Sequence, residues 1–185
     1  VHGSWRALRR HDGWRLDPEA GERLRAANPW TEATLGGGAL WLLGAHWTGA
    51  RQQSLIVEFW HDGQALPDAE WDRWAARNAA LTASAAPASA RAGNLAWQAT
   101  PFETPGLRRD NLFVRLAWQP ERWQFTLDAL FAPADRGRIV TAGAQWQGER
   151  WRLNAAARMN GGPVDSVFAQ LPTRRTGLLA ATLAF

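Results

Sequence analysis

The C-terminal part of the chain alternates apolar residues with polar or small ones. Between Asp110 and Phe185 the alternation recurs in five runs, which are separated by turn residues. Successive side chains of a β-strand point to opposite faces, so strict alternation predicts strands with one apolar and one polar face. The pattern therefore predicts an antiparallel sheet with a continuous hydrocarbon face and a face that carries charges in mid-strand. The five runs are residues 111–119, 123–131, 138–146, 151–159 and 176–185.

Tryptophans border the short turns between these runs. Trp118 and Trp123 flank one turn, Trp146 and Trp151 flank another, and all four fall on the apolar face. Tryptophan favours a membrane–water interface, because its ring is apolar while its N–H needs a polar partner. A ring of aromatic residues beside short turns is typical of the rim of a transmembrane β-barrel. We expect such an interface girdle to consist of Trp47, Trp118, Trp123, Trp146, Trp151 and Phe185.

The last run ends on Phe185, with Leu183, Ala181, Leu179 and Gly177 on its apolar face. In these features the chain resembles bacterial outer-membrane β-barrel proteins, whose final strand commonly ends in phenylalanine. The resemblance covers residues 110–185. It implies an all-β, antiparallel up-and-down transmembrane β-barrel in the outer membrane of a Gram-negative bacterium. It also implies two partners, namely the lipid bilayer and the barrel-assembly machinery, which reads the C-terminal strand.

The N-terminal half supplies three further expected strands. Residues 38–47 and 54–60 alternate in the same way around a short turn, and residues 1–10 form a less regular run. The tripeptide His-Asp-Gly occurs at 11–13 and again at 61–63, where we expect a turn each time rather than a repeated metal or catalytic element. The total is about eight strands, an even number and the smallest closed barrel. Residues 1–185 are then one barrel domain or the C-terminal fragment of a larger barrel, and Val1 suggests a processed chain or a fragment.

Residues 62–110 are too long for a plain hairpin connection. Pro67 and Asp68 predict a helix start, and Trp71 and Trp74 lie on one helical stripe, so we expect a helix over 67–84. Alternating the strand directions back from the C-terminus places the short turns on the periplasmic side and the long segments outside. Residues 62–110 are therefore expected to be an extracellular loop that packs over the barrel, gates it or binds a partner.

Composition narrows the range of functions. There is no Cys, which excludes disulfides and thiolate metal sites, and no motif indicates a cofactor. All 21 basic residues are Arg, the net charge is +4, and no basic run with interleaved aromatic residues indicates nucleic-acid binding. No apolar run reaches the roughly 18 residues of a membrane helix. Thirteen Trp beside no Tyr fit an interface girdle better than the core of a soluble domain.

The polar face suggests a pore interior. If the apolar face meets lipid, the inward-pointing residues are Glu58, Arg115, Asp128, Arg152, Asn154 and Arg158. Placing Trp118 opposite Trp123 sets Phe113 across from Asp128, with Arg115 diagonal to that carboxylate. Such a set of charges predicts a porin-like channel or passive export pore for small anionic or polar solutes.

Three other interpretations remain open. The charges can form a cross-strand lattice that fills a narrow barrel, whose outer loops then have a structural or partner-binding role. A soluble, lipocalin-like ligand-binding barrel would instead turn the apolar face inward. Enzymatic function is the least favoured, because His46 and Ser54 have no identifiable third catalytic partner.

Overall fold

A computed structural model describes residues 1–104 and 106–183 of the chain. Two compact units can be distinguished by their internal contacts. The sheet unit comprises Val1–Ser4, Leu42–Trp60 and Asp110–Phe185, and the helical unit comprises Trp5–Trp41 and His61–Arg109. Phe185, the predicted assembly signal and girdle residue, lies outside the described residues.

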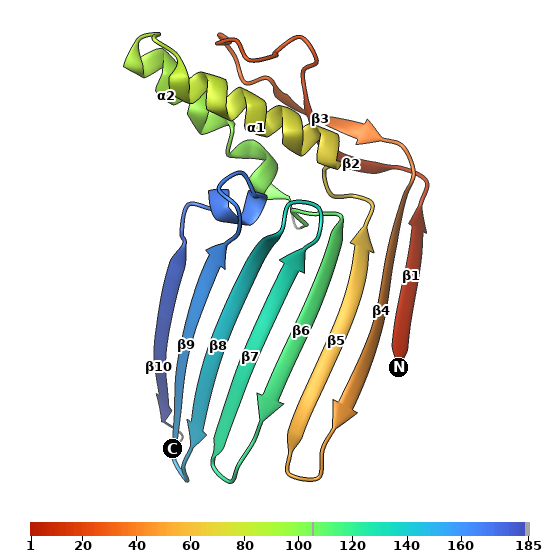
Figure 1. Ribbon diagram of the computed structural model, residues 1–185, viewed down its shortest axis with the longest axis vertical. Helices are drawn as coiled ribbons and strands as arrows, with labels where there is room; N and C mark the ends of the chain where they lie inside the picture. Colours follow the sequence, from red (N-terminus) through yellow and green to blue (C-terminus); the bar gives the residue numbers. More distant parts are fainter. Residues whose placement is uncertain (105, 184–185) are drawn as a thin grey trace. The chain divides into compact units, whose positions relative to one another are not determined.

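The described residues contain ten strands, two α-helices and two short 3-10 helices (Figure 1). The strands are β1 (His2–Leu8), β2 (His11–Leu16), β3 (Trp30–Leu35), β4 (Gly38–Thr48), β5 (Gln53–Asp62), β6 (Asp110–Trp118), β7 (Trp123–Ala132), β8 (Gly137–Gln147), β9 (Trp151–Gly161) and β10 (Arg175–Leu183). The helices are α1 (Asp68–Ala83), α2 (Ala88–Trp97), η1 (Thr100–Glu103) and η2 (Val167–Gln170).

Eight of the strands form one sheet in the order β1-β4-β5-β6-β7-β8-β9-β10. The pairs from β6 to β10 are antiparallel, so the expected all-β, antiparallel architecture is confirmed. The expected closed barrel is not observed: over residues 1–104 and 106–183, β1 and β10 remain the two edges of an open sheet (Figure 1). An edge strand keeps unpaired N–H and C=O groups, which is the state that closure would remove.

The apolar face of the sheet unit is the exposed face. Along β7 the residues Trp123, Phe125 and Leu127 are 45%, 40% and 43% exposed, whereas the intervening polar residues are half-buried. Leu153 and Leu183 on neighbouring strands are also open, at 44% and 38%. In a sheet stabilised in water, the hydrocarbon face packs against a core and the polar face is solvated. The sheet unit shows the opposite arrangement.

The β6–β7 register differs from the expected one by two residues. Arg115 lies directly opposite Asp128, and Trp118 pairs with Phe125 rather than with Trp123. The cause lies in the turn at 119–122, where the Trp123 N–H donates to the carbonyl of Pro120 (2.9 Å) and Glu121 adopts a positive φ of 49°. A shift by two residues leaves every side chain on its expected face, because the side-chain period of a strand is two.

The helical unit has a conventional core. Trp71 and Trp74 of α1 are 3% and 4% exposed, and both make edge-to-face contacts with Phe102, at ring distances of 5.3 and 5.4 Å. The predicted helix over 67–84 is confirmed as α1, which begins after Pro67. The second helix, α2, was not predicted, because its short Ala- and Ser-rich sequence is part of the Ala-, Ser-, Pro- and Gly-rich connection that follows α1. Neither α-helix of the described residues has the length and hydrophobicity needed to cross a membrane.

A buried guanidinium connects the parts of the helical unit. Arg77, only 1% exposed, donates to the carbonyl groups of Ala20 (3.3 Å), Gly21 (2.9 Å) and Arg23 (2.6 Å), and also to the Asn94 side chain (2.9 Å). These bonds tie the long connection between β2 and β3 to both α-helices. Burial lowers the pKa of Arg77 from its ordinary value, and the positive charge of Arg25 lowers it further.

The first His-Asp-Gly tripeptide does not form the expected turn. His11, Asp12 and Gly13 belong to β2, which pairs with β3 in a separate two-stranded sheet. Asp12 accepts a hydrogen bond from the Thr34 hydroxyl across this pair, at 2.8 Å, and so has a cross-strand partner. The second tripeptide does end a strand, since β5 stops at Asp62 and Gly63 follows as a turn.

Candidate functional site: the polar face of the sheet

The strand registers arrange the polar face of the sheet unit in successive transverse rows. Residues that pair from strand to strand lie at one height, because hydrogen-bonded neighbours are directly opposite each other. One row is polar throughout and carries most of the charge, and we call it the charged row. It consists of Arg115, Asp128, Thr141, Arg158 and Thr176.

A two-pronged ion pair dominates the charged row. Arg115 Nε and Nη2 donate to the two oxygens of Asp128, each at 2.7 Å. Parallel N–H···O bonds of this kind fix the planar groups relative to each other. Beside them, Arg158 donates to the Thr141 hydroxyl at 3.1 Å and has no carboxylate partner among the described ion pairs. The row therefore holds one neutralised arginine and one uncompensated arginine.

The next row toward the turns at 119–122 and 148–150, which we call the hairpin end, is made of small residues. It contains Ala117, Thr126, Gly143 and Ala156, and we call it the small row. A Cβ atom at Gly143 would lie 2.7 Å from the Thr126 hydroxyl, so a larger residue there would make the threonine side chain move. Small side chains keep the space above this part of the sheet open, whereas the long side chains of the charged row project into it.

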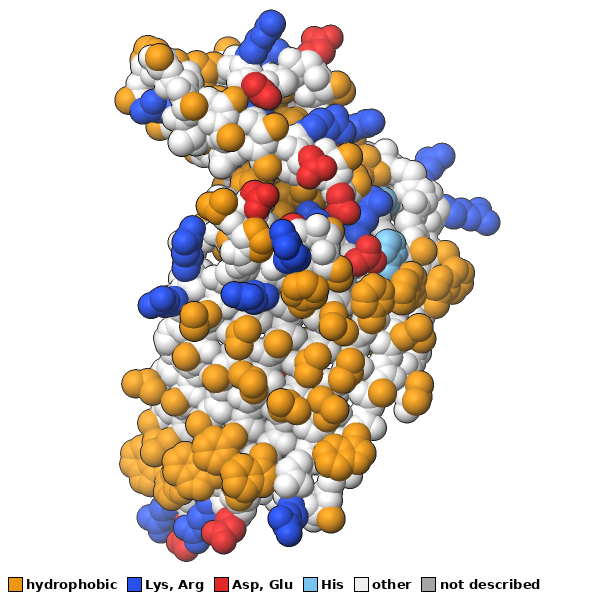
Figure 2. All heavy atoms as spheres, in the orientation of Figure 1, with side chains coloured by type: hydrophobic (Ala, Val, Ile, Leu, Met, Phe, Trp, Pro, Cys, Tyr) orange, Lys and Arg blue, Asp and Glu red, His pale blue; other side chains and the backbone are white. Residues whose placement is uncertain are grey.

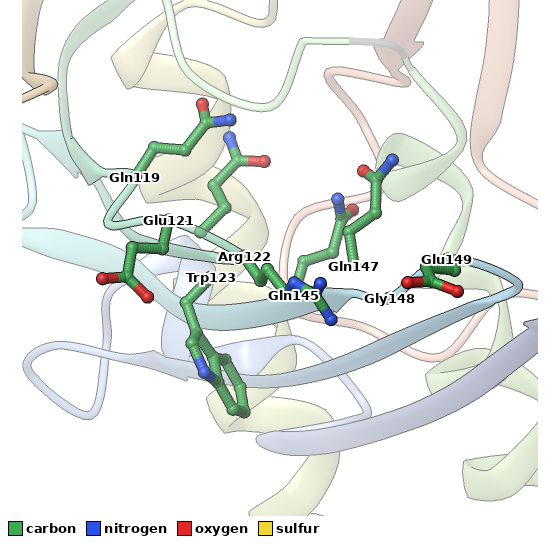
Figure 3. A pocket seen from close by; sticks show the side chains of 9 residues that line it. Gln119, Glu121, Arg122, Trp123, Gln145, Gln147, Gly148 and Glu149 are labelled. Carbon is green, nitrogen blue, oxygen red and sulfur yellow. The ribbon is translucent and has the colours of Figure 1, made fainter.

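Amide side chains follow the small row at the hairpin end. Gln124, Gln145 and Asn154 pair across β7, β8 and β9, and we call this the amide row. Together with Gln119 and Gln147 they belong to the face of Arg115. Figure 3 shows glutamines from both hairpins converging on one space, while Trp123 points away from it. The space is a cavity of about 370 Å³, also bordered by Glu121, Arg122 and Glu149 of the turns.

At the opposite end the same face becomes apolar. Phe113, Leu130 and Ile139 pair across β6, β7 and β8, and Trp60 of β5 approaches the Phe113 ring to 6.2 Å. From the hairpins outward the face is thus lined by amides, then small residues, then charges and finally hydrocarbon.

The structure brings together several of the predicted lumen residues. Arg115, Asp128 and Arg158 share the charged row, Asn154 lies in the amide row, and Arg152 pairs with Gln147 one step nearer the turns. Glu58 lies elsewhere on the face and contacts the His2 ring at 3.0 Å. The glutamines and threonines of the face were not among the predicted lumen residues, although the alternation assigned Gln119, Gln124 and Thr126 to this face. Their alternation with the apolar residues of the same strands is a signal that identifies them: Gln119, Gln124, Thr126, Thr141, Gln145 and Gln147.

The predicted girdle tryptophans lie near the turns at 49–52, 119–122 and 148–150, which occur at one end of the sheet unit (Figure 1). The four-residue turn at 133–136 joins β7 to β8 at the other end. Trp118, Trp123 and Trp151 are exposed and Trp146 is half-buried. Figure 2 shows large hydrophobic groups gathered near the hairpin end, with charged groups beyond them. Trp47 lies beside the turn glycine Gly49, as Trp146 lies beside Gly148, and a Cβ on either glycine would approach the ring to within 2.7 Å. The glycines thus let both rings fold over the turns.

His46, one of the two candidate catalytic residues, lies near the turn at 49–52. The His46 ring nitrogen lies 3.1 Å from the Thr48 hydroxyl, the hydrogen-bond partner that the structure gives it. Over residues 1–104 and 106–183, no three His, Asp or Glu side chains come together as a possible metal site. The face offers hydrogen-bonding amides and charges, which suit solvation and selection of small polar species.

Comparison with known proteins does not identify the chain. No family model matches it, and no match is found among curated proteins or solved structures. The function therefore has to be argued from the residues and geometry of the chain itself.

Proposed function

We propose that the sheet unit spans an outer membrane as a β-barrel, with its apolar face in lipid, and that its polar face lines a passive, porin-like pore. The observation that carries the membrane part is the exposed hydrocarbon face, seen most clearly on β7, where the apolar residues are exposed and the alternating polar residues are half-buried. The arginines of the polar face, Arg115, Arg152 and Arg158, are themselves exposed. In water this exposed hydrocarbon would be hydrated unfavourably, whereas the acyl chains of a bilayer would cover it.

The dimensions of the apolar face support this proposal. Strands β6 to β10 have 9, 10, 11, 11 and 9 residues, and about 9–11 residues suffice for a tilted strand to cross a bilayer. From Trp123 to Phe131 the apolar side of β7 extends about 27 Å at ~3.4 Å per residue. At a tilt of about 40° this gives roughly 20 Å, close to the ~25 Å apolar band of outer-membrane barrels.

The polar face supports a pore for small polar solutes, with a preference for anions. Three arginines, Arg115, Arg152 and Arg158, face two carboxylates, Glu58 and Asp128, which leaves one positive charge in excess. A ring of fixed charge raises the local concentration of counter-ions and selects by sign. The small row beside the charged row leaves room for a hydrated solute at that height.

A second candidate function is a filled barrel whose outer segments bind a partner. The Arg115–Asp128 ion pair favours this alternative, because paired charges of this kind close a narrow interior rather than attract solutes. An interior of only eight strands is just wide enough for side chains to fill it. The two functions differ in one measurable property, namely ion conductance.

Planar-bilayer recording of the reconstituted chain tests the proposal. We expect stepwise conductance with a mild anion preference, and Ala156→Trp should lower it several-fold by filling the small row. The matched control is Ala157→Trp, the adjacent residue on the apolar face, which should leave conductance unchanged. Inserted protein without conductance would refute the pore and favour the filled barrel. Equal effects of the two variants would contradict the assignment of faces.

A further inference from the structure

The apolar face carries a hollow on its last three strands. Ala142 and Ala157 pair with each other, Gly177 lies beside Ala157, and the next step toward the hairpins adds Ala144 and Ala155. These small residues border an open cavity of about 670 Å³. A second cavity of about 440 Å³ shares Ala144 and Ala155 and continues toward the hairpin end. Together they form a shallow groove that runs along the strands.

Larger side chains border this groove on the side of β7. Phe125 pairs with Ala144, and Leu127 pairs with Ala142, so a step in height separates β7 from the small residues of β8. On β10, Leu179 stands 87% exposed between Gly177 and Ala181. A groove with these borders has the form and chemistry that suit a hydrocarbon chain lying along the strands.

Two arginines lie at the end of the groove away from the hairpins. Arg175 precedes Gly177 by one step on the same face of β10, and Arg138 occupies the corresponding end of β8. The strand spacings put their Cα atoms about 12 Å apart. On β9 between them lie Gly161, which pairs with Arg138, and Met159, which pairs with Arg175 and is 55% exposed. A Cβ at Gly161 would meet no atom within 4 Å, so the space beside Arg138 is open, while the Met159 side chain borders Arg175.

Arginines outnumber carboxylates at this end, where Asp135 and Asp165 are the acidic residues of the two loops. Among the described residues, Arg136, Arg138, Arg174 and Arg175 form no ion pair. The neighbouring carboxylate of Asp135 accepts backbone N–H groups of Gly137 and Val167, at 2.9 and 2.8 Å. Figure 2 shows basic groups along the border of the hydrophobic area over the ends of β8 to β10. Arginine binds phosphate with two parallel hydrogen bonds, which suits it to this position.

We propose that this groove binds a phosphate-bearing lipid, with the phosphate at Arg138 and Arg175 and an acyl chain over the small residues of β8, β9 and β10. The proposal rests on the proposed function, because it requires the apolar face to meet lipid. It goes further by assigning one strip of that face to one chemical class of lipid. Two observations support the lipid site. The arginines and the hydrocarbon groove lie on the same strands and on the same face, and the positive charge of the arginines complements a phosphate.

Native mass spectrometry of the detergent-solubilised full chain tests the site with dioleoyl phosphatidic acid and dioleoyl phosphatidylcholine. We expect phosphatidic acid to be retained about tenfold over phosphatidylcholine. The double variant Arg138→Gln/Arg175→Gln should abolish this preference. The matched control, Arg122→Gln/Arg150→Gln, removes two arginines from the turns at the other end and should preserve it. Ala157→Leu should weaken retention by filling the groove, whereas Ala156→Leu on the opposite face should not.

Four results would overturn the proposal. The first is equal retention of both lipids, and the second is loss of the preference in the turn variant. The third is displacement of the lipid by glycerol 3-phosphate, which would indicate a phosphate site without an acyl groove. Dimers in place of lipid adducts would assign the face to a second copy and also refute it. Quenching of tryptophan fluorescence by brominated phosphatidylcholine distinguishes failure of the membrane proposal from failure of the lipid-site proposal. If the tryptophans are not quenched, the membrane proposal is refuted. If they are quenched but phosphatidic acid is not preferred, only the lipid site is refuted.

Discussion

The tryptophans in the core of the helical unit and those on the apolar face of the sheet unit lie in opposite environments, while Trp5 of the helical unit is 72% exposed. In the helical unit, Trp30, Trp71 and Trp74 are at most 4% exposed, and Trp30 and Trp74 donate hydrogen bonds to Gln98. In the sheet unit, Trp118 and Trp151 are 47% and 49% exposed on a face made of hydrocarbon. The same residue type thus serves as core in one unit and as surface in the other.

The two units also treat polar groups differently. The helical unit buries Arg77, Asn94 and Gln98, and each of them forms several hydrogen bonds within the unit. The sheet unit instead collects polar side chains on one face, where they are half-buried or exposed, and its hydrocarbon on the other. The first arrangement suits a unit that excludes water by its own packing. The second needs an apolar solvent on one side, and this contrast is what the following predictions test.

The largest expected effect is in the helical unit, at Arg77→Met. The variant removes the donor to three carbonyl groups and to Asn94, and leaves these acceptors buried. Breaking a buried polar arrangement from one side costs about 3–5 kcal/mol. We expect faster hydrogen exchange throughout the helical unit, measured by mass spectrometry, with unchanged protection of β6 to β10.

The control for this variant is Arg73→Met. Arg73 is half exposed and forms an i,i+3 ion pair with Glu70, so its loss should cost less than about 1 kcal/mol. Equal losses of protection at the two positions would show that Arg77 does not hold the helical unit together. Loss of protection in β6 to β10 would show that the two units do not fold separately.

A smaller effect is expected from charge placed on the sheet. Leu127→Arg puts a guanidinium on the apolar face in mid-strand and should reduce folding stability in liposomes by roughly 2–4 kcal/mol. Asp128→Arg, one residue later, places the same group on the polar face and should be much milder. Urea titration of folding into liposomes compares the two variants. If the two variants lost the same folding stability, the apolar face would not be in lipid, and the contrast between the sheet unit and the helical unit would not hold.

Much of the fold could be predicted because β-alternation is a local signal. All eight strands expected from alternation are found in the main sheet, and α1 was marked by Pro67 and its tryptophan stripe. The faces of the polar residues Arg115, Asp128 and Arg158 were also correct, since a face depends only on parity along the strand.

Other features depend on information that is not local. The β6–β7 register depends on the backbone geometry of the turn at 119–122, which residue types alone did not fix. The strands β2 and β3 pair across a 13-residue connection, whose path depends on carbonyl bonds to Arg77 on a distant helix. The rows of the polar face also follow from registers, so the juxtaposition of Gln145 with Asn154 needed the structure.

The smallest expected effect tests the register and the character of the polar face together. Exchanging the charges, Arg115→Asp with Asp128→Arg, should restore most of the stability lost in either single variant, because the two residues lie directly opposite. The coupling should be about 0.5–1 kcal/mol, since both side chains are partly exposed and solvent screens them. A double-mutant cycle of folding into liposomes measures it. A coupling near zero would contradict the pairing, whereas one of several kcal/mol would indicate a dry interior like that around Arg77, and would favour the filled barrel over the pore.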